Sequence, residues 1–205
     1  MSRFTGPRLK VMRALGVDLP GLSRKSIEQR PTPPGQHGAK ATRRKKSDFG
    51  VKLMEKQKLR FNYGLSERQL RRLVVDARRG KAPTGETLLQ LLERRLDNVV
   101  FRAGFAPTIA AARQLVSHRH LQLNGKVVSI PSIRLRIGDE VSLKGKSQQL
   151  PLVAETLKEM PLIRPEWLTW DEQQKVAKVA HLPAAEDVPF PVDVQQVVEY
   201  YANRL

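Results

Sequence analysis

Lysine and arginine are the residues of this chain whose types and spacing could most readily do chemistry. Four cations stand together at Arg43-Arg44-Lys45-Lys46, and Lys52, Lys56 and Arg60 follow at four-residue spacing. A third group comprises Arg68, Arg71, Arg72, Arg78 and Arg79. Ammonium and guanidinium groups neutralise phosphates, and the planar guanidinium fork can bridge two phosphate oxygens. The chemistry that this pattern favours is binding of a polyanion, for which nucleic acid is the commonest candidate.

The charge of the chain is unevenly distributed. The 205 residues hold 37 Lys and Arg against 20 Asp and Glu, a net charge of +17. Residues 1–80 have 21 basic and 6 acidic side chains, residues 81–146 have 11 and 5, and residues 147–205 have 5 and 9. A solvated helix face normally interleaves acids with bases, and the first 80 residues do not. The gradient predicts a front that faces RNA and an acidic tail that packs on the fold or on another protein.

Groups suited to metal binding or covalent catalysis are sparse. The absence of cysteine excludes disulfides, thiolate catalysis and cysteine-ligated zinc. His118 and His120 have no carboxylate or thiolate in register, so we predict no metal and no cofactor and expect both histidines to bond RNA or cap a helix. No apolar run reaches the length of a membrane span, and the polar start lacks a signal-peptide core. We expect a soluble, unexported protein without a membrane partner.

Helices should position the cations of the first half. Residues 30–38 are too rich in Pro and Gly for regular structure and predict an extended loop. A helical pattern runs from Ser47 to Tyr63, and the capping-box sequence Ser66-x-x-Gln69 opens a second helix that ends near Arg79. The apolar residues of the second helix lie on one face, so its arginines should point outward.

The middle of the chain changes from helix to strand. Apolar residues at three- and four-residue spacing from Leu88 to Ala103 predict one helix that ends at Gly104, and Thr108 should cap a short helix that ends near His118. Asn124-Gly125 is a strong hairpin-turn signal after a strand at 121–123. Further strands are expected at 133–137, with Arg134 and Arg136 facing away from the core, and at 141–143.

The tail carries two tryptophans, several prolines and a last predicted helix. One face of this helix holds Val194, Val197, Val198 and Tyr201. These residues are expected to pack within the fold, and the alternative is an interface with a neighbouring protein.

Three stretches resemble the RNA-binding domain named after small-subunit ribosomal protein S4. They are Arg95-Leu96-Asp97-Asn98-Val99-Val100-Phe101-Arg102, Ala112-Arg113-Gln114-Leu115-Val116-Ser117-His118 and Leu123-Asn124-Gly125-Lys126-Val127-Val128. Flanking stretches resemble the full-length family, among them Pro33-Pro34-Gly35-Gln36-His37-Gly38, Glu55-Lys56-Gln57-Lys58, Arg164-Pro165-Glu166-Trp167-Leu168 and Val198-Glu199-Tyr200-Tyr201. The resemblance covers nearly the whole chain.

The resemblance implies an α+β fold and a purely structural function. It places a small domain of two helices and an antiparallel sheet, residues 87–146, inside a helical domain formed by residues 1–86 and a C-terminal segment, 147–205, that returns to pack with them. Members are primary binders of the 5′ domain of small-subunit ribosomal RNA at a multi-helix junction, and they act early in subunit assembly. They also meet ribosomal protein S5 and other small-subunit proteins and lie near the channel through which messenger RNA enters, which links them to translational accuracy. The compartment implied is the bacterial cytoplasm, with the plastid stroma as an alternative.

The chain departs from the family pattern at two places. Many bacterial members bind zinc through N-terminal cysteines, which are absent here, and Gly6-Pro7-Arg8-Leu9-Lys10 and Leu19-Pro20-Gly21-Leu22 resemble the cyanobacterial and plastid branch. Arg119 stands where relatives often carry Gly. A left-handed backbone there would strain a side chain, so we expect a slightly different turn and one added phosphate contact.

Competing functions explain less of the sequence. Arg-Leu-Asp is also the signature of pseudouridine synthases that carry this domain, but the segment after Lys146 is too short for their catalytic fold, so Asp97 is expected to pair with an arginine or face solvent. A free RNA chaperone or heat-shock RNA binder would explain the domain but not its flanks, and a DNA-compacting protein would explain only the charge. We predict no enzyme and no small-molecule substrate.

The residues expected to contact RNA are Arg3, Arg8, Lys10, Arg13, Gln36, His37, Arg43, Arg44, Lys45, Lys46, Lys52, Lys56, Lys58, Arg60, Arg68, Arg71, Arg72, Arg94, Arg95, Arg102, Arg113, Ser117, His118, Arg119, His120, Asn124, Lys126, Arg134 and Arg136.

Overall fold

The chain folds into two compact units. The computed structural model describes residues 4–41, 46–202 and 204. Unit 1 comprises Met1–Leu88 and Pro189–Leu205, and unit 2 comprises Leu89–Val188. The chain therefore leaves unit 1, builds unit 2 and returns, which confirms the predicted α+β fold with a domain inserted between two terminal segments. Unit 1 holds 23 basic and 9 acidic residues, and unit 2 holds 14 and 11, so most of the positive charge belongs to unit 1.

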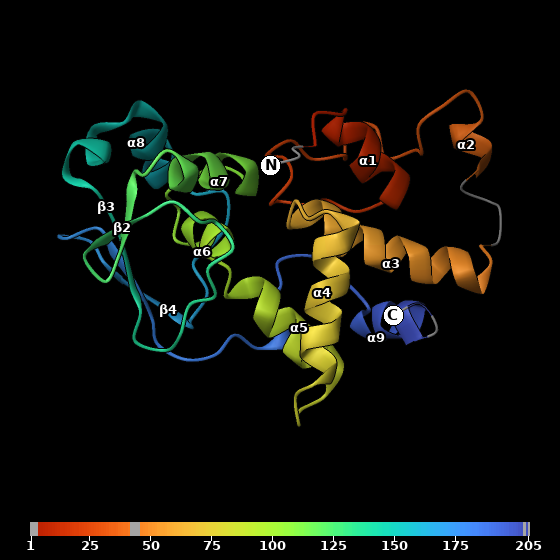
Figure 1. Ribbon diagram of the computed structural model, residues 1–205. Coiled ribbons are helices and arrows are strands. Elements are labelled where there is room, and N and C mark those ends of the chain that lie inside the picture. The colour runs from red at the N-terminus through yellow and green to blue at the C-terminus, as the bar shows by residue number, and fades with distance from the viewer. Residues whose placement is uncertain (1–3, 42–45, 203, 205) are drawn as a thin grey trace. The chain divides into compact units, whose positions relative to one another are not determined.

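Unit 1 is helical in the part that the structure describes (Figure 1). Its helices are α1 (Arg8–Leu15), α2 (Gly38–Ala41), α3 (Asp48–Asn62), α4 (Glu67–Arg78) and α9 (Val194–Ala202), and α5 (Thr84–Glu93) contains the boundary with unit 2. The Ser47 side chain caps α3 by accepting the Gly50 N–H at 3.2 Å. At α4 the Ser66 hydroxyl accepts the Gln69 N–H at 3.3 Å while the Gln69 side chain accepts the Ser66 N–H at 3.0 Å. Both predicted helices and the capping box are thus confirmed.

Unit 2 combines helices with one antiparallel sheet. Its elements after α5 are α6 (Leu96–Arg102), α7 (Ile109–Ser117), β1 (Leu121–Leu123), β2 (Lys126–Val128), β3 (Glu140–Leu143), the short 3-10 helix η1 (Gly145–Gln149), α8 (Pro151–Lys158), β4 (Leu168–Asp171), β5 (Val176–Val179) and η2 (Ala185–Asp187). The strand order is β2-β1-β3-β5-β4. Asn124 and Gly125 have φ of 50° and 76°, as the predicted two-residue hairpin turn requires. Leu121, Val141 and Ala177 are among the buried strand residues through which the sheet contributes to the core.

The single helix expected from Leu88 to Ala103 is wrong, because the chain breaks between α5 and α6. At the break the backbone bonds to a distant segment in place of the preceding helical turn. The Leu96 N–H donates to the Ile133 carbonyl at 2.8 Å, and the Leu135 N–H donates to the Arg94 carbonyl at 2.9 Å. The apolar spacing continues across the break because α5 and α6 both bury that face.

The strand expected at 133–137 is also wrong. This segment forms only an isolated bridge, Arg95 with Arg134, and Ile137 is 58% exposed although Leu135 is fully buried. Its hydrogen-bonding groups are used at the break between α5 and α6, so it does not join the sheet. The sheet is completed instead by β4 and β5, which the sequence analysis missed; β5 pairs with β3 in the register Val141 to Ala177.

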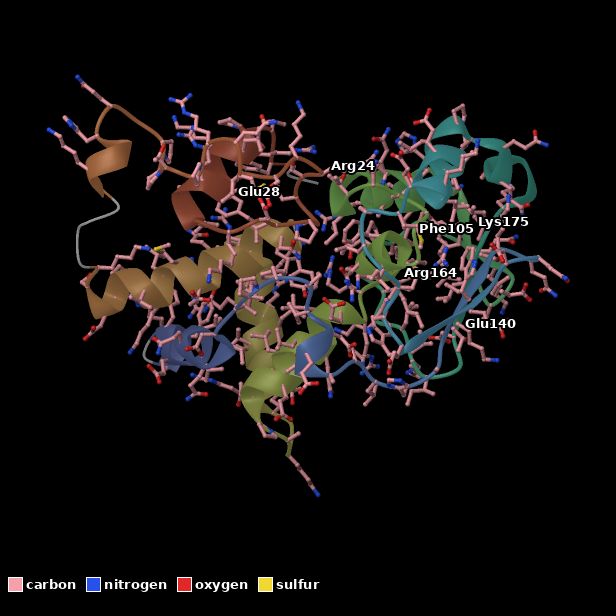
Figure 2. All side chains as sticks on the ribbon, turned by 180° about the vertical axis from the view of Figure 1, so that it is seen from behind. Arg24, Glu28, Phe105, Glu140, Arg164 and Lys175 are labelled. Atoms are coloured by element: carbon pink, nitrogen blue, oxygen red, sulfur yellow. The ribbon has the colours of Figure 1, made fainter. Side chains whose placement is uncertain are left out.

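The structure divides the C-terminal segment differently from the expected boundary at residue 146. Residues up to Val188 belong to unit 2, and only those from Pro189 onward return to unit 1. The β3–β5 pairing is one cause, and Arg164 is another (Figure 2). Its guanidinium lies over the Trp170 ring at 4.0 Å, and its Nε donates to the Ala103 carbonyl at the end of α6 at 2.9 Å. Together these contacts attach β4 and β5 to the small domain.

Helix α9 packs against α3 within unit 1, as expected, and for two of its four apolar residues the alternative of an interface with a neighbouring protein is wrong. Val197 is 0% exposed and Tyr201 is 2% exposed, so both are core residues. Val194 and Val198 are half-buried. The Tyr201 hydroxyl donates to Glu67 at 2.6 Å, and Lys56 Nζ pairs with the other oxygen of that carboxylate at 2.8 Å. Helices α3, α4 and α9 are therefore joined through one carboxylate.

The Glu67 carboxylate, which joins α3, α4 and α9, should make unit 1 sensitive to acid. Burial acts to raise the pKa of Glu67, but hydrogen bonds from Lys56 and Tyr201 outweigh it, so that the pKa lies below its ordinary value. A group with a lowered folded-state pKa contributes stability that is lost as the pH falls through that pKa. In urea unfolding at several pH values, Glu67→Gln should lose less stability than the wild type between about pH 5 and pH 3. The exposed-site control Glu86→Gln should follow the wild type, and identical curves for all three proteins would contradict the assigned role.

Candidate nucleic-acid interface

The outer face of α4 presents the densest set of available cations. Its buried residues are Leu70, Leu73, Val74 and Ala77. Five arginines are exposed on this helix and at its C-terminal end: Arg68, Arg71, Arg72, Arg78 and Arg79. Among the described residues none of these guanidinium groups has a hydrogen-bond, ion-pair or ring partner. Like charges three and four residues apart on a helix repel each other, so the free protein gains nothing from this arrangement.

Further cations of unit 1 precede α4. Arg8 and Lys10 of α1 are exposed, as are Gln36, His37 and Lys46. Arg13 is used internally, because its Nε donates to the Thr32 carbonyl at 2.9 Å and so ties α1 to the Pro-rich loop. The candidates Arg3, Arg43, Arg44 and Lys45 lie outside the described residues.

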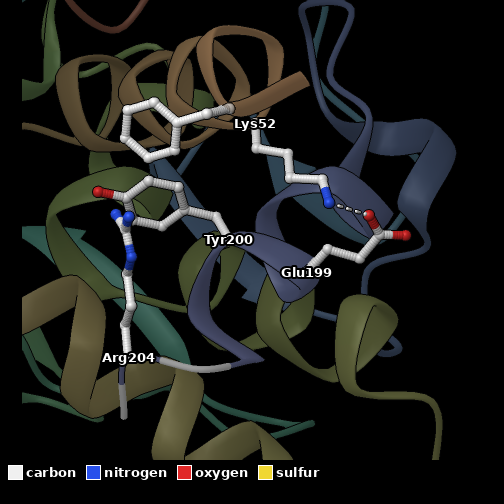
Figure 3. A pocket seen from close by; sticks show the side chains of 5 residues that line it. Lys52, Glu199, Tyr200 and Arg204 are labelled. Carbon is white, nitrogen blue, oxygen red and sulfur yellow. Dashed lines mark ion pairs between the residues drawn. The ribbon is translucent and has the colours of Figure 1, made fainter. Parts of the chain in front are cut away.

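Three lysines of α3 are engaged with acids, contrary to the expectation that they face RNA: Lys52 and Lys56 of the four-residue stripe, and Lys58. Lys52 pairs with Glu199 at 2.9 Å (Figure 3), Lys56 with Glu67 at 2.8 Å and Lys58 with Glu55 at 2.6 Å. Only 5% of the Lys56 side chain is exposed, so it is corrected from a phosphate ligand to a structural residue. Lys52, Lys58 and Arg60 remain partly accessible, and Arg60 donates to Gln57 at 3.3 Å. The helical spacing shows which cations share a face of α3. It does not show the partners of Lys52 and Lys56, because these acids belong to α9 and α4, whereas the partner of Lys58 lies in α3 itself.

A shallow hollow of about 280 Å³ adjoins this stripe. Phe49, Lys52, Glu199, Tyr200 and Arg204 line it. The Arg204 guanidinium lies 4.6 Å from the centre of the Tyr200 ring and 4.7 Å from that of Phe49, as Figure 3 shows for Tyr200. The cations here already have aromatic or acidic partners, so the hollow adds little to a phosphate-binding surface.

Three arginines of the small domain are also internal. Arg95 is 5% exposed and makes two bonds to the Asp97 carboxylate, at 3.1 and 2.8 Å. Arg113, expected to contact RNA, has 16% of its side chain exposed and reaches Asp97 at 2.7 Å. Arg102 is 5% exposed and donates to the Asp187 carbonyl at 2.8 Å. The expectation that Arg95 and Arg102 clamp phosphates is corrected, because burial and internal bonds leave no room for one. Asp97 does pair with arginines, as expected.

Arg94, Arg134 and Arg136 form a second basic group, in unit 2. Arg134 and Arg136 are exposed, and Arg94 Nε donates to the Leu135 carbonyl at 2.7 Å. Burial and the charges of Arg134 and Arg136 lower the pKa of Arg94, while Asp139 acts against them. The three cations therefore lie near enough to one another to share one region of positive potential, which an anion would stabilise.

The end of α7 and the hairpin supply the remaining candidates. His118, Arg119 and Lys126 are exposed, Ser117 and His120 are partly exposed, and His120 Nδ1 lies 3.0 Å from the Ser147 hydroxyl. Asn124 is used internally: it donates to Asp139 at 2.8 Å and accepts the Glu140 N–H at 2.9 Å, which fixes the hairpin to β3. Arg119 has φ of 62°, so the expected different turn is wrong and the left-handed backbone is kept. Exposed Lys144 beside this turn was missed, because only its backbone bond to His120, more than 20 residues earlier, brings it there.

Within the described ranges, no three His, Asp or Glu side chains are grouped so that they could hold a metal ion. In the same ranges no helix has the length and apolarity that crossing a membrane requires.

Comparison with known proteins assigns the chain to a family. Residues 3–93 match the model of the ribosomal protein S4/S9 N-terminal domain, and residues 94–141 match that of the S4 domain. The chain is 84% identical to the small ribosomal subunit protein uS4 of Methylobacillus flagellatus and 76% identical to uS4B of Nitrosomonas europaea, with each chain covered completely. The chain belongs to the uS4 family.

Similarity within the uS4 family extends to cyanobacteria. The uS4 protein of a Synechococcus strain is 50% identical over the full length of both chains, below the values for Methylobacillus and Nitrosomonas. The predicted family is confirmed, and the cyanobacterial likeness applies to about half of the positions. The S4-domain match begins at Arg94, where α5 has just ended, and stops at Val141 in β3, so β4 and β5 lie beyond it.

Proposed function

We propose that this uS4-family chain is a structural component of the small ribosomal subunit that binds ribosomal RNA and performs no catalysis. The observation that carries the proposal is the row of five exposed arginines on α4 without partners among the described residues. Such a row is unfavourable in the free protein and favourable against a phosphate backbone. The identity of 84% to a uS4 protein supports the ribosomal setting.

The mechanism is scaffolding. Each unit has its own basic group, α4 and α1 in unit 1 and Arg94, Arg134 and Arg136 in unit 2, so one chain can hold more than one RNA segment. Capped helices and a bonded hairpin keep these cations in place before RNA arrives, which reduces the entropy lost on binding. Aromatic residues make up only 5% of the chain, so phosphate contacts should outweigh base stacking.

The finer assignment follows the family resemblance. The RNA segment is the 5′ domain of small-subunit ribosomal RNA at a multi-helix junction, and binding occurs early in assembly. Ribosomal protein S5, other small-subunit proteins and messenger RNA near its channel are the further partners, through which the chain contributes to translational accuracy. The setting is the ribosome of a bacterial cytoplasm.

A binding titration at fixed salt tests this proposal. The full chain is titrated with a small-subunit ribosomal RNA 5′-domain transcript, a scrambled RNA of equal length and duplex DNA. We expect the transcript to bind at least about 10³-fold more tightly than the other two, which is the usual separation of specific from non-specific binding. Equal binding to both RNAs would favour a free RNA chaperone, and equal binding to all three would leave only a basic adhesive surface.

A further inference from the structure

Arg119 occupies a backbone position that suits glycine. The residue follows α7 with φ of 62°, where the Arg119 N–H donates to the Val116 carbonyl at 2.9 Å and the His120 N–H donates to the Leu115 carbonyl at 3.1 Å. These two bonds form the common helix-ending motif whose left-handed residue is usually Gly. A side chain at this position is strained. The turn itself therefore does not account for an arginine.

The Arg119 side chain makes no stabilising polar or ring contact with the described part of the chain. It is exposed, and among the described residues its guanidinium has no hydrogen-bond, ion-pair or ring partner. Its surroundings are basic: His118 is exposed, and the Lys144 N–H bonds to the His120 carbonyl at 2.9 Å, which brings exposed Lys144 beside the turn.

The acids of this region are engaged elsewhere. Between residues 109 and 147 the only acids are Asp139 and Glu140. Asp139 accepts bonds from Asn124 and from the Arg136 N–H, and Glu140 pairs with Lys178 at 3.0 Å. Within residues 109–147 of the described structure, therefore, no carboxylate is left over to neutralise the cations around the turn.

A cation at this turn also interacts with the negative end of the α7 dipole. That effect is screened by salt at an exposed site and would be served equally by lysine or by the adjacent histidine. It does not favour a guanidinium in a strained position. Strain kept at an exposed, unpartnered residue points to a ligand.

We propose that Arg119 is a phosphate-binding residue that, with Lys144 beside it, extends the RNA surface around the end of α7 by one backbone phosphate. The inference rests on the proposed RNA-binding function and adds a specific residue to it. Its ligand is the phosphodiester of the bound RNA, because the surrounding cations match a polyanion.

Replacing Arg119 with glycine should change stability and affinity in opposite directions. Arg119→Gly removes the strain, so Tm should rise by about 2–4 °C. Its binding to the 5′-domain transcript should be about 5- to 10-fold weaker in Kd at about 0.1 M salt. The salt slope, which is the slope of log K for binding against log salt concentration, should be smaller in magnitude by about 0.7–0.9. Arg119→Lys keeps charge and strain, so its Tm and slope should equal those of the wild type and its Kd should lie within about threefold.

Lys175 provides the matched control (Figure 2). It too is a cation with positive φ, 53°, and it stands in the turn between β4 and β5, which follows Asp171 and contains Glu172. Lys175→Gly removes the same charge and the same kind of strain from an acidic turn. Its Tm should rise like that of Arg119→Gly, while its Kd and salt slope should stay those of the wild type.

The outcomes separate the two claims. If the wild type prefers the transcript but Arg119→Gly binds it as the wild type does, Arg119 touches no phosphate and only the inference is overturned. If both glycine variants weaken binding equally, the effect is net charge, and the inference is again overturned. If the wild type itself shows no preference for the transcript, the proposed function fails first.

Discussion

Replacing Asp97 with alanine should lower the free energy of unfolding by about 3–5 kcal/mol. Only 1% of the Asp97 side chain is exposed, and its carboxylate receives Arg95 at 2.8 Å and Arg113 at 2.7 Å. Its Oδ1 also accepts the Asn98 N–H at 3.0 Å. The variant leaves the buried Arg95 guanidinium without its counter-ion and removes one partner of Arg113, and an uncompensated buried charge costs far more than the ion pair contributes. Urea unfolding of the full chain measures the loss.

The control for Asp97→Ala is an exposed acid of the same unit. Glu166→Ala should change stability by less than about 0.5 kcal/mol. A triple variant, Arg95→Met, Asp97→Leu and Arg113→Met, removes all three charges together and should recover much of the loss, because apolar groups of similar volume replace buried ion pairs well. A loss below about 1 kcal/mol for Asp97→Ala, or no recovery in the triple variant, would show that the cluster is solvated and structurally minor.

Elements with a local signal were predictable. The helices α3, α4 and α7 each begin at a Ser or Thr whose side chain accepts a backbone N–H of the first turn, at 3.2, 3.3 and 3.3 Å. Such caps are read from a few adjacent residues, as is the Asn124-Gly125 turn. The left-handed residue after α7 was anticipated as a position for Gly, but the conclusion that Arg119 would change the turn was wrong. Two backbone bonds outweigh the strain of one side chain.

Features fixed by distant partners were not predictable. The break between α5 and α6 depends on backbone bonds to residues 131–135, and the apolar period conceals it. Strand β5 joins the sheet by pairing with β3, more than 30 residues earlier in the chain, and β4 joins it only by pairing with β5. Sequence spacing shows which residues share a face of an element, and it does not show what lies opposite that face.

The same limit applies to the candidate site. Residue type identified the cations, but their partners decide which of them can meet RNA. Lys56 and Arg71 look alike in the sequence, yet Lys56 is 4% exposed and bonded to Glu67 whereas Arg71 is exposed. The difference arises because α9, from the far end of the chain, covers α3. Functional assignment of a basic helix therefore requires its acidic neighbours as well as its own charges.

Neutralising the outer face of α4 should abolish most RNA affinity while slightly stabilising the free protein. The variant replaces Arg68, Arg71, Arg72, Arg78 and Arg79 with glutamine. If each arginine neutralises one phosphate, the salt slope should fall by about 4 and the Kd should weaken by about 10³-fold or more at about 0.1 M salt. Relief of like-charge pairs should raise the free energy of unfolding by a few tenths of a kcal/mol per pair, about 0.2–0.5. Opposite signs in the two measurements would distinguish a binding face from a solvated one.

A comparison of two double variants isolates the role of free charge. Arg71→Gln with Arg72→Gln and Lys52→Gln with Lys58→Gln each remove two positive charges from unit 1. The first pair is unpartnered in the described structure, while the second is paired with Glu199 and Glu55 at 2.9 and 2.6 Å. Only the α4 variant should lose about 1.5 in salt slope, and only the α3 variant should lose stability. Equal slopes would mean that α3 and α4 contact RNA alike, and that an acid bonded to a lysine in the free protein is displaced by phosphate when RNA binds.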